Sequence, residues 1–338
     1  MEFFGLDIGS HKIKIVQVQK SGDKYRLVAL GSAPSTLKGI LSDSESDLTQ
    51  LAIIIKKLHQ ETKIKTKNVV TALPQDQVFT QVITLPQLSE NELTSALKWE
   101  AEQYIPIPLA EATISHQIIG RIKEDAKEKI EVLLAAAPNR LIDKTIKVVK
   151  SAGFNTVSLE TEILAAARSL VINPEAVMVI DFGAKASDIA VVENKQIIFT
   201  RSIPTAGEAL TRAVASSLGL QPAQAEAYKK AYGVDPQKLE GKMIEAMIPV
   251  IDVIIREIEK ILNFYRVEKK KTISRIILTG GTATLSEISS LMVKKLNLEI
   301  QLGNPFSQMS KESLPKKLPT SEIPLYAIAT GLAMKEIR

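Results

Sequence analysis

Two similar segments carry an aspartate and a glycine at matching positions, one at the start of the chain and one near its middle. In Leu6–Ile15 and in Ile180–Ile189, an apolar run ends in Asp-x-Gly, a short turn follows, and a second run begins. This pattern places a carboxylate at the carboxyl end of a strand, and the glycine lets the backbone approach a phosphate closely. We therefore expect two hairpins that clamp a polyphosphate, with Asp7 and Asp181 holding Mg²⁺ mostly through water.

A third glycine-containing segment, Leu278–Ala283, lies between a predicted strand and a predicted helix. The N-terminus of a helix attracts anions, so a nucleotide could contact the backbone here. The segment is neither a Walker loop nor Gly-x-Gly-x-x-Gly. A single Asp-x-Gly turn or Gly-Gly pair is usually structural, but two matched hairpins followed by this segment together favour nucleotide binding.

The duplication predicts two similar α/β lobes that face each other across a cleft. Apolar alternation predicts strands at 3–8, 13–18, 24–30, 67–73, 176–183, 187–192, 196–202 and 275–278. The predicted helices include 49–59, 139–151, 162–170 and 239–268. We expect residues 1–74 to start the first lobe, a β-α-β-β-α block at 75–152 to form a small inserted subdomain, and 153–338 to form the second lobe, with about 320–338 packing back on the first.

The composition excludes several classes of function. The chain has 338 residues, a net charge of +5, three histidines and no cysteine, so it has no disulfide framework and no cysteine-based metal site. The lysines are dispersed and aromatic residues make up only 4%, so we expect no nucleic-acid partner. No apolar run reaches the roughly 18–20 residues that span a bilayer, and we expect no direct membrane insertion. The basic run 267–271 is expected to be a solvated helix end, with contact to anionic lipid or an acidic partner as the alternative.

These three segments resemble the phosphate and adenosine motifs of the actin-like ATPase superfamily, which includes actin, sugar kinases, chaperone ATPases and the cell-division protein FtsA. Within it, the chain is similar over essentially its whole length to the type IV pilus assembly PilM family. The segments that carry this closer resemblance are Trp99–Pro106, Glu160–Glu162, Arg201–Pro204 and Asn304–Phe306. The resemblance implies an α/β, actin-like (ribonuclease H-like) duplicated fold, with two lobes around a nucleotide cleft and a small inserted α+β subdomain.

The resemblance also implies roles for particular residues. Glu162 would be the catalytic, water-polarising acid. Glu226 and Lys229 would border the ribose and base, or else form an ordinary helical ion pair. The residues implied to bind ATP are Asp7, Gly9, Ser10, Lys14, Asp181, Gly183, Ala184, Ser187, Gly207, Glu226, Lys229, Gly280, Gly281 and Thr282.

The function implied by the family is a cytoplasmic, ATP- and Mg²⁺-binding scaffold that binds the N-terminal cytoplasmic peptide of PilN at the inner face of the membrane. The pilus assembly ATPase and the platform protein are further implied partners. Trp99, Tyr104 and Ile105 would line the peptide groove, unless they belong to the core. The second turn has Ala184 and Ala186 where strong hydrolases carry glycine and threonine, so we expect at most weak ATPase activity. A small-molecule kinase and an FtsA-like filament-forming ATPase are the alternatives.

Overall fold

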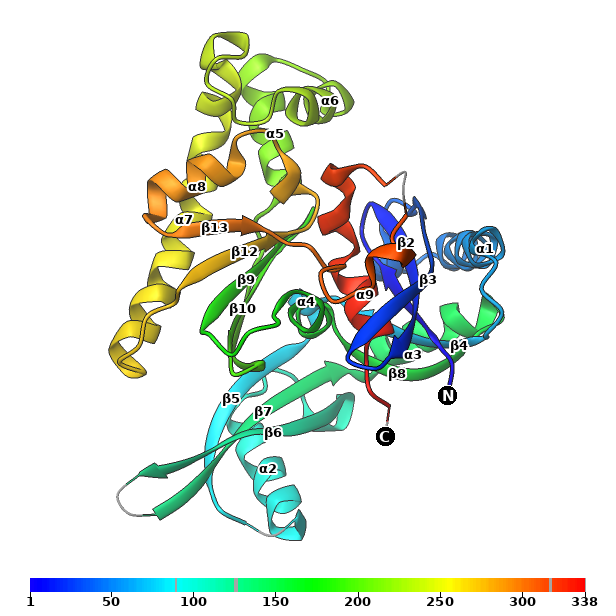
Figure 1. Ribbon diagram of the computed structural model, residues 1–338, viewed down its shortest axis with the longest axis vertical. Helices are drawn as coiled ribbons and strands as arrows, with labels where there is room; N and C mark the ends of the chain where they lie inside the picture. Colours follow the sequence, from blue (N-terminus) through cyan, green and yellow to red (C-terminus); the bar gives the residue numbers. More distant parts are fainter. Residues whose placement is uncertain (89, 125–126, 316–317, 338) are drawn as a thin grey trace.

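The computed structural model has two lobes and a smaller subdomain, which lies at the bottom of Figure 1 below one of the lobes. It describes residues 1–88, 90–124, 127–315 and 318–337. Each lobe contains a five-stranded sheet, and the subdomain contains a three-stranded sheet. In the described part of the chain, no helix is long and apolar enough to cross a bilayer.

The first lobe is built on a sheet with the strand order β3-β2-β1-β4-β8. The chain enters it through an antiparallel hairpin and then adds two parallel strands. The bounds of these strands are β1 Phe4–Ile8, β2 Lys12–Ser21, β3 Lys24–Pro34, β4 Asn68–Leu73 and β8 Asn155–Thr161. Helices α1 (Glu45–Thr62) and α3 (Asn139–Ser151) pack together and share one apolar core with β1 and β2.

The second lobe repeats this arrangement, with the strand order β11-β10-β9-β12-β13. Again an antiparallel hairpin, β9 with β10, is followed by a parallel neighbour, β12. The strands are β9 Val177–Phe182, β10 Ser187–Glu193, β11 Gln196–Ile203, β12 Arg275–Thr279 and β13 Glu299–Leu302. The helices are α5 Gly207–Leu218, α6 Pro222–Tyr232, α7 Lys242–Glu268 and α8 Ile288–Leu296, and the apolar faces of α5, α7 and α8 join the core of this lobe.

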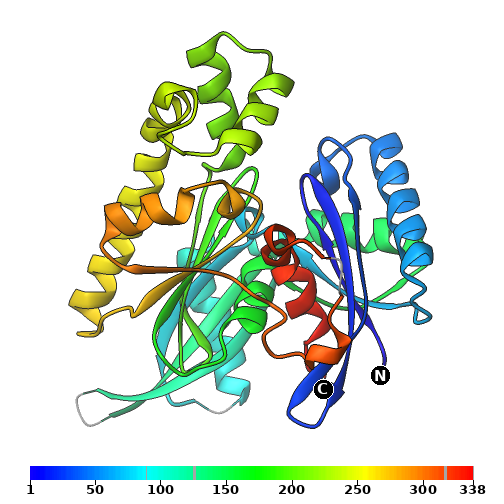
Figure 2. The ribbon, with the colours of Figure 1, turned by 45° about the horizontal axis from the view of Figure 1, so that its top comes forward.

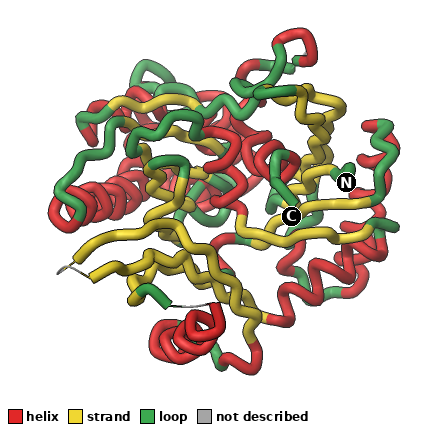
Figure 3. The backbone as a smooth tube through the Cα atoms, turned by 60° about the horizontal axis from the view of Figure 1, so that its bottom comes forward, coloured by secondary structure: helices red, strands yellow, loops and turns green. Residues whose placement is uncertain are grey.

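The small subdomain, called the insert from here on, spans residues 79–138. Its sheet has the order β5-β7-β6, and α2 (Glu90–Tyr104) covers one face of it (Figure 3). The strands are β5 Phe79–Pro86, β6 Ala112–Glu124 and β7 Lys127–Pro138.

The structure moves two of the expected boundaries. Helix α3 was expected in the insert, but its apolar residues Val148 and Val149 are buried in the core of the first lobe. Strand β8 was expected to open the second lobe, but it pairs with β4 in the first sheet. Both segments therefore belong to the first lobe, and the insert ends at residue 138.

The lobes are joined by α4 (Glu162–Leu170), which leads from β8 to β9, and by the returning C-terminal segment. This segment leaves β13 and runs along the first lobe, where Ser310 N donates to Tyr25 O at 2.8 Å. Helix α9 (Ala327–Ala333) then packs beside α4 between the two sheets (Figure 2). A Cβ at Gly331 would lie 1.7 Å from Ala165 O, so only glycine permits this close crossing.

Candidate functional site

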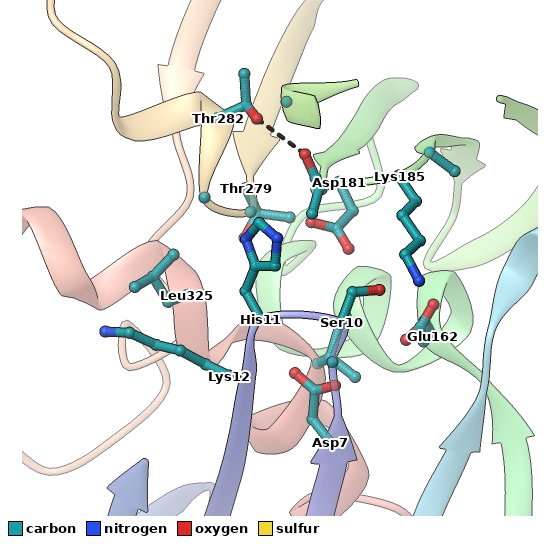
Figure 4. Close-up of a pocket in the computed structure, with 18 of the residues that line it drawn as sticks. Asp7, Ser10, His11, Lys12, Glu162, Asp181, Lys185, Thr279, Thr282 and Leu325 are labelled. Atoms are coloured by element: carbon teal, nitrogen blue, oxygen red, sulfur yellow. Dashed lines mark hydrogen bonds between the residues drawn. The ribbon is translucent and has the colours of Figure 1, made fainter. Parts of the chain in front are cut away.

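Both Asp-x-Gly hairpins and the third glycine segment line one cavity of about 550 Å³ between the lobes. In Figure 4, Asp7 and Asp181 point into this cavity from opposite lobes, and Glu162 enters it from the start of α4. Asp7 and Asp181 are each the last residue but one of their strands, β1 and β9. The carboxyl ends of these two strands therefore place the aspartates. The pairing predicted from the duplication thus brings the two carboxylates to a common space.

On the first hairpin, Asp7 pairs with a lysine on the neighbouring strand. Lys14 Nζ donates to Asp7 Oδ2 at 2.6 Å, and both side chains are largely buried. Burial acts to lower the pKa of Lys14, but the Asp7 carboxylate outweighs it and the pKa is raised. Asp7 Oδ1 is buried and has no hydrogen-bond partner among the described residues. A buried carboxylate oxygen without a partner is costly, and it is suited to a ligand, a metal ion or water.

On the second hairpin, the equivalent cross-strand neighbour is an acid. Asp7 lies opposite Lys14 in the sheet, and Asp181 lies opposite Asp188. Burial raises the pKa of Asp188 to about 8, against the hydrogen bond that Ser202 Oγ donates to its Oδ1. Burial also raises the pKa of Asp181 to about 6; Lys14 opposes this rise and Asp7 adds to it. The cavity therefore gathers buried carboxyl groups, and their mutual proximity and burial favour the protonated forms.

Glu162 adds to this cluster. Burial, and then the charges of Asp7, Asp188 and Asp181, raise its pKa well above the ordinary value for glutamate. Its Oε2 accepts a hydrogen bond from Gln75 N at 3.3 Å. Lys185 also lines the cavity, and Figure 4 shows its side chain extending toward Glu162.

The residues of the cavity fit a hydrated magnesium ion. In the part of the chain that the structure describes, no group of three or more His, Asp or Glu side chains could hold a metal ion by itself. Magnesium usually keeps several waters and is bound by one or two carboxylates together with phosphates. Asp7, with its unpartnered Oδ1, and Asp181 on the facing hairpin match this mode of binding.

Gly280 and Gly281 of the third segment differ in their backbone conformation and in the space around the Cβ position. Gly280 has a φ of +86°, and a Cβ there would lie 2.3 Å from Asp181 Oδ1, so the fold itself requires glycine. Gly281 has an ordinary helical φ of −66°, and nothing lies within 4 Å of its Cβ position. Thr282 Oγ1 donates to Gly183 O at 2.8 Å, the dashed bond in Figure 4, and so ties this segment to the second hairpin. At Gly281 the backbone faces open cavity.

Glu226 and Lys229 form a buried network on the second lobe. Lys229 Nζ donates to Gly207 O and Thr211 Oγ1, both at 2.8 Å, and lies 2.7 Å from Glu226 Oε2. Burial lowers the pKa of Lys229. The pKa of Glu226 falls to about 2, because the hydrogen bonds from Lys229 and Thr211 outweigh the opposing effect of burial. This is more than an exposed helical ion pair, since it fixes α6 to the start of α5 at the wall of the cavity.

Of the residues implied to bind ATP, all but Ser187 line the cavity, and so does Glu162. Ser187 is fully buried and its Oγ donates to Thr205 O at 2.7 Å, so its role is to hold the hairpin. Asp188 was not predicted from the sequence, although the alignment of the two hairpins places it at the position of Lys14. Further lining residues, which come from three short 3₁₀ helices and the residue before one of them, were not predicted either, because no local pattern indicates their place in the fold. These include Lys38, Leu41, Asp76, Ser321, Glu322 and Leu325.

None of the residues assigned to the peptide groove lines this cavity. The Trp99 side chain is 69% exposed and Tyr104 is 43% exposed, so neither belongs to the core. Ile105 is buried in the core of the insert, and its side chain has no free face for a peptide.

Known proteins of similar sequence and structure place this fold among the actin-like ATPases. The cell division protein FtsA of Pseudomonas aeruginosa is 21% identical over 373 residues, covering 98% of this chain and 88% of FtsA. MreB5 of Spiroplasma citri, in a structure bound to ADP, has a TM-score of 0.51 at 15% identity, covering 98% of this chain and 95% of its own. A PilM-PilN type IV pilus biogenesis complex has a TM-score of 0.84 at 27% identity, covering 99% of this chain and 98% of its own.

The fold is therefore the duplicated actin-like fold that the resemblance implied. The model of the family described as type IV pilus assembly protein PilM matches residues 5–337, and the chain belongs to this family.

Proposed function

We propose that this protein binds ATP with Mg²⁺ in the cavity between its lobes and works as a scaffold of the type IV pilus assembly complex. The observation that carries the proposal is that Asp7 and Asp181, equivalent residues of two matched hairpins, line the same cavity. A ligand that contacts both hairpins would hold the two lobes together. ADP in the structure of the similarly folded MreB5 supports a nucleotide as that ligand.

Each group of lining residues has a distinct task in this proposal. A bound magnesium ion would supply positive charge next to the terminal phosphates. Asp7 and Asp181 would hold its waters, and Lys14 would keep Asp7 ionised and in place. The open backbone at Gly281 leaves room for the adenosine, and the network of Glu226 and Lys229 would fix the wall beside the ribose.

The same residues predict slow turnover. Glu162 is the candidate for the acid that orients the attacking water, and burial together with the nearby carboxylates raises its pKa, which favours the protonated form. A protonated carboxyl is a poor general base. Ala184 and Ala186 in the second turn add no hydroxyl donors. We therefore propose that the protein holds ATP for long periods, with weak hydrolysis or none.

The proposed partner is the N-terminal cytoplasmic peptide of PilN, which would bring this protein to the inner face of the cytoplasmic membrane. The solved PilM-PilN complex, similar over 99% of this chain at 27% identity, supports this partner. The pilus assembly ATPase and the platform protein are further proposed contacts. Exposed Trp99 and Tyr104 remain candidates for a protein contact on α2, whereas buried Ile105 does not.

Calorimetry on the full chain tests both parts of the proposal. We expect Mg-ATP to bind with micromolar or better affinity, and a synthetic PilN N-terminal peptide to bind the same preparation. Trp99→Ala should weaken binding of the peptide and leave binding of Mg-ATP unaffected, because Trp99 is not among the residues that line the cavity. A folded preparation that binds neither ligand would contradict the proposed function.

A further inference from the structure

The insert is connected by the chain to the first lobe but packs on the second. It leaves the first lobe after β4 and returns to it at α3, yet its strands β5 and β6 contact β11 of the second lobe. Leu133 of the insert and Ile197 of β11 lie in one apolar cluster. A change in the angle between the lobes must therefore either move the insert relative to β11, which breaks this contact, or move it relative to the first lobe.

A part-buried pair of hydroxyl groups lies in this contact. Thr80 Oγ1 on β5 and Thr200 Oγ1 on β11 are 2.6 Å apart and share a hydrogen bond. Gln75 Nε2 donates to the same Thr80 oxygen at 2.9 Å. Gln75 is 3% exposed, and its Oε1 has no partner among the described residues. Polar groups buried in this way favour one arrangement of the surrounding elements over others.

Gln75, and a residue of β11 close to Thr200, also hydrogen-bond to two carboxyl groups of the cavity between the lobes. Gln75 N donates to Glu162 Oε2 at 3.3 Å. On β11, Ser202 lies two residues after Thr200, and its Oγ donates to Asp188 Oδ1 at 2.5 Å. One path of hydrogen bonds, through Gln75, thus leads from the cavity to Thr80. On the other side, the hydrogen bond of Ser202 to Asp188 is linked to Thr200 through the strand β11 itself.

We propose that the Thr80–Thr200 pair is the contact through which a nucleotide in the cavity fixes the position of the insert. This inference rests on the proposed binding of ATP. A ligand shifts a conformational equilibrium only if it binds one state better, and a nucleotide held by both hairpins binds the closed arrangement better. The hydroxyl pair joins the two lobes only in that arrangement. By reciprocity, a protein partner that holds the insert in this position strengthens nucleotide binding.

Distance measurements between two spin labels test the inference in the full chain. The sequence has no cysteine, so Gln117→Cys on β6 and Glu259→Cys on α7 give two exposed labelling sites on the insert and the second lobe. In the otherwise wild-type protein, Mg-AMPPNP is expected to narrow and shift the distance distribution. Thr200→Val removes one hydroxyl and keeps the shape of the side chain. This variant should still bind Mg-AMPPNP, about 2- to 10-fold more weakly, and should lose the shift.

Two further variants serve as controls. Thr200→Ser keeps the hydroxyl and should restore the shift. Thr113→Val makes the same substitution at an exposed position of the insert and should change nothing. A Thr200→Val protein that responds like the wild type, or a wild type that binds the nucleotide without any shift, would overturn the inference. A wild type that binds no nucleotide in calorimetry would overturn the proposed function itself, and this inference with it.

Discussion

The two hairpins differ at one matching position, and this difference sets the electrostatics of the cavity. Lys14 lies opposite Asp7, whereas Asp188 lies opposite Asp181. The first aspartate therefore has a cation opposite it in its own hairpin, whereas the second has another acid opposite it. Comparing the two hairpins residue by residue would have predicted Asp188 from the sequence. Its burial and raised pKa could not be predicted, because they depend on α4 and β11, which approach it only in the folded chain.

The raised pKa of Asp188 predicts a pH dependence of stability in the nucleotide-free protein. Its pKa is about 8 when folded and near 4 when unfolded, so between these values the folded state holds a proton that the unfolded state has lost. The free energy of unfolding therefore falls as pH rises through this window. Asp188→Asn should raise the melting temperature at pH 8.5 by on the order of 5 °C and have little effect at pH 4.5.

The control for this prediction is Asp143→Asn, which removes an exposed aspartate from α3. Thermal unfolding followed by circular dichroism gives the melting temperature of each variant at pH 8.5 and at pH 4.5. An equal effect of Asp188→Asn at the two pH values would contradict the assigned cause.

Lys185 predicts a preference for the triphosphate. It lines the cavity on the second hairpin and forms no ion pair with any described residue, so its charge is available to a ligand. A charge-assisted hydrogen bond contributes about 1.5–3 kcal/mol, so Lys185→Ala should weaken Mg-ATP about 10-fold or more. ADP lacks the terminal phosphate, so the same substitution should lower the affinity for ADP by less than about 3-fold. Lys195→Ala, in an exposed turn of the same sheet, is the control. Equal losses for ATP and ADP would exclude a contact with the terminal phosphate.

Strands and hairpins with strong apolar alternation were predicted well, and short or context-dependent elements were not. The hairpins β1–β2 and β9–β10 carry their own signal in Asp-x-Gly and in the apolar runs around it. Helix α3 was found from its periodicity, but the pattern cannot tell which core its buried face joins. Strand β13 was missed because its four residues, Glu299–Leu302, are mostly exposed and have little pattern.

The turn after β12 predicts a graded steric effect on the ligand. Gly281 has a φ that any residue can adopt, and open space surrounds its Cβ position, so larger side chains should fold normally. Gly281→Ala should weaken Mg-ATP slightly, and Gly281→Leu should weaken it by about 100-fold because the side chain would occupy the space of the ligand. Melting temperatures of the free proteins should remain within a few degrees of the wild type. Full binding by Gly281→Leu would place the nucleotide elsewhere.

The two-lobed architecture could be predicted from the internal duplication. A strand-turn-strand unit is not stable by itself, so each copy needs further strands and a core of its own. The way the lobes are joined could not be predicted in the same way. Helices α4 and α9 cross closely at Gly331 and Ala165, and the buried carboxylate of Glu160 forms ion pairs with the part-exposed Arg168 and Lys335. The contacts of Gly331 with Ala165 and of Lys335 with Glu160 join residues far apart in the sequence, so no local pattern could indicate them.

The claim that both hairpins act on one ligand is tested most directly by calorimetry of Mg-ATP with Asp7→Asn, Asp181→Asn and the double variant. Asparagine preserves the shape of each side chain and removes the charge that holds the hydrated metal ion. We predict that each single variant binds Mg-ATP at least about 10-fold more weakly, and that the double variant loses less than the product of the two effects because both residues serve one ion. With EDTA present to remove Mg²⁺, the wild type and the three variants should bind ATP with similar affinity. Wild-type affinity in both single variants would contradict the account.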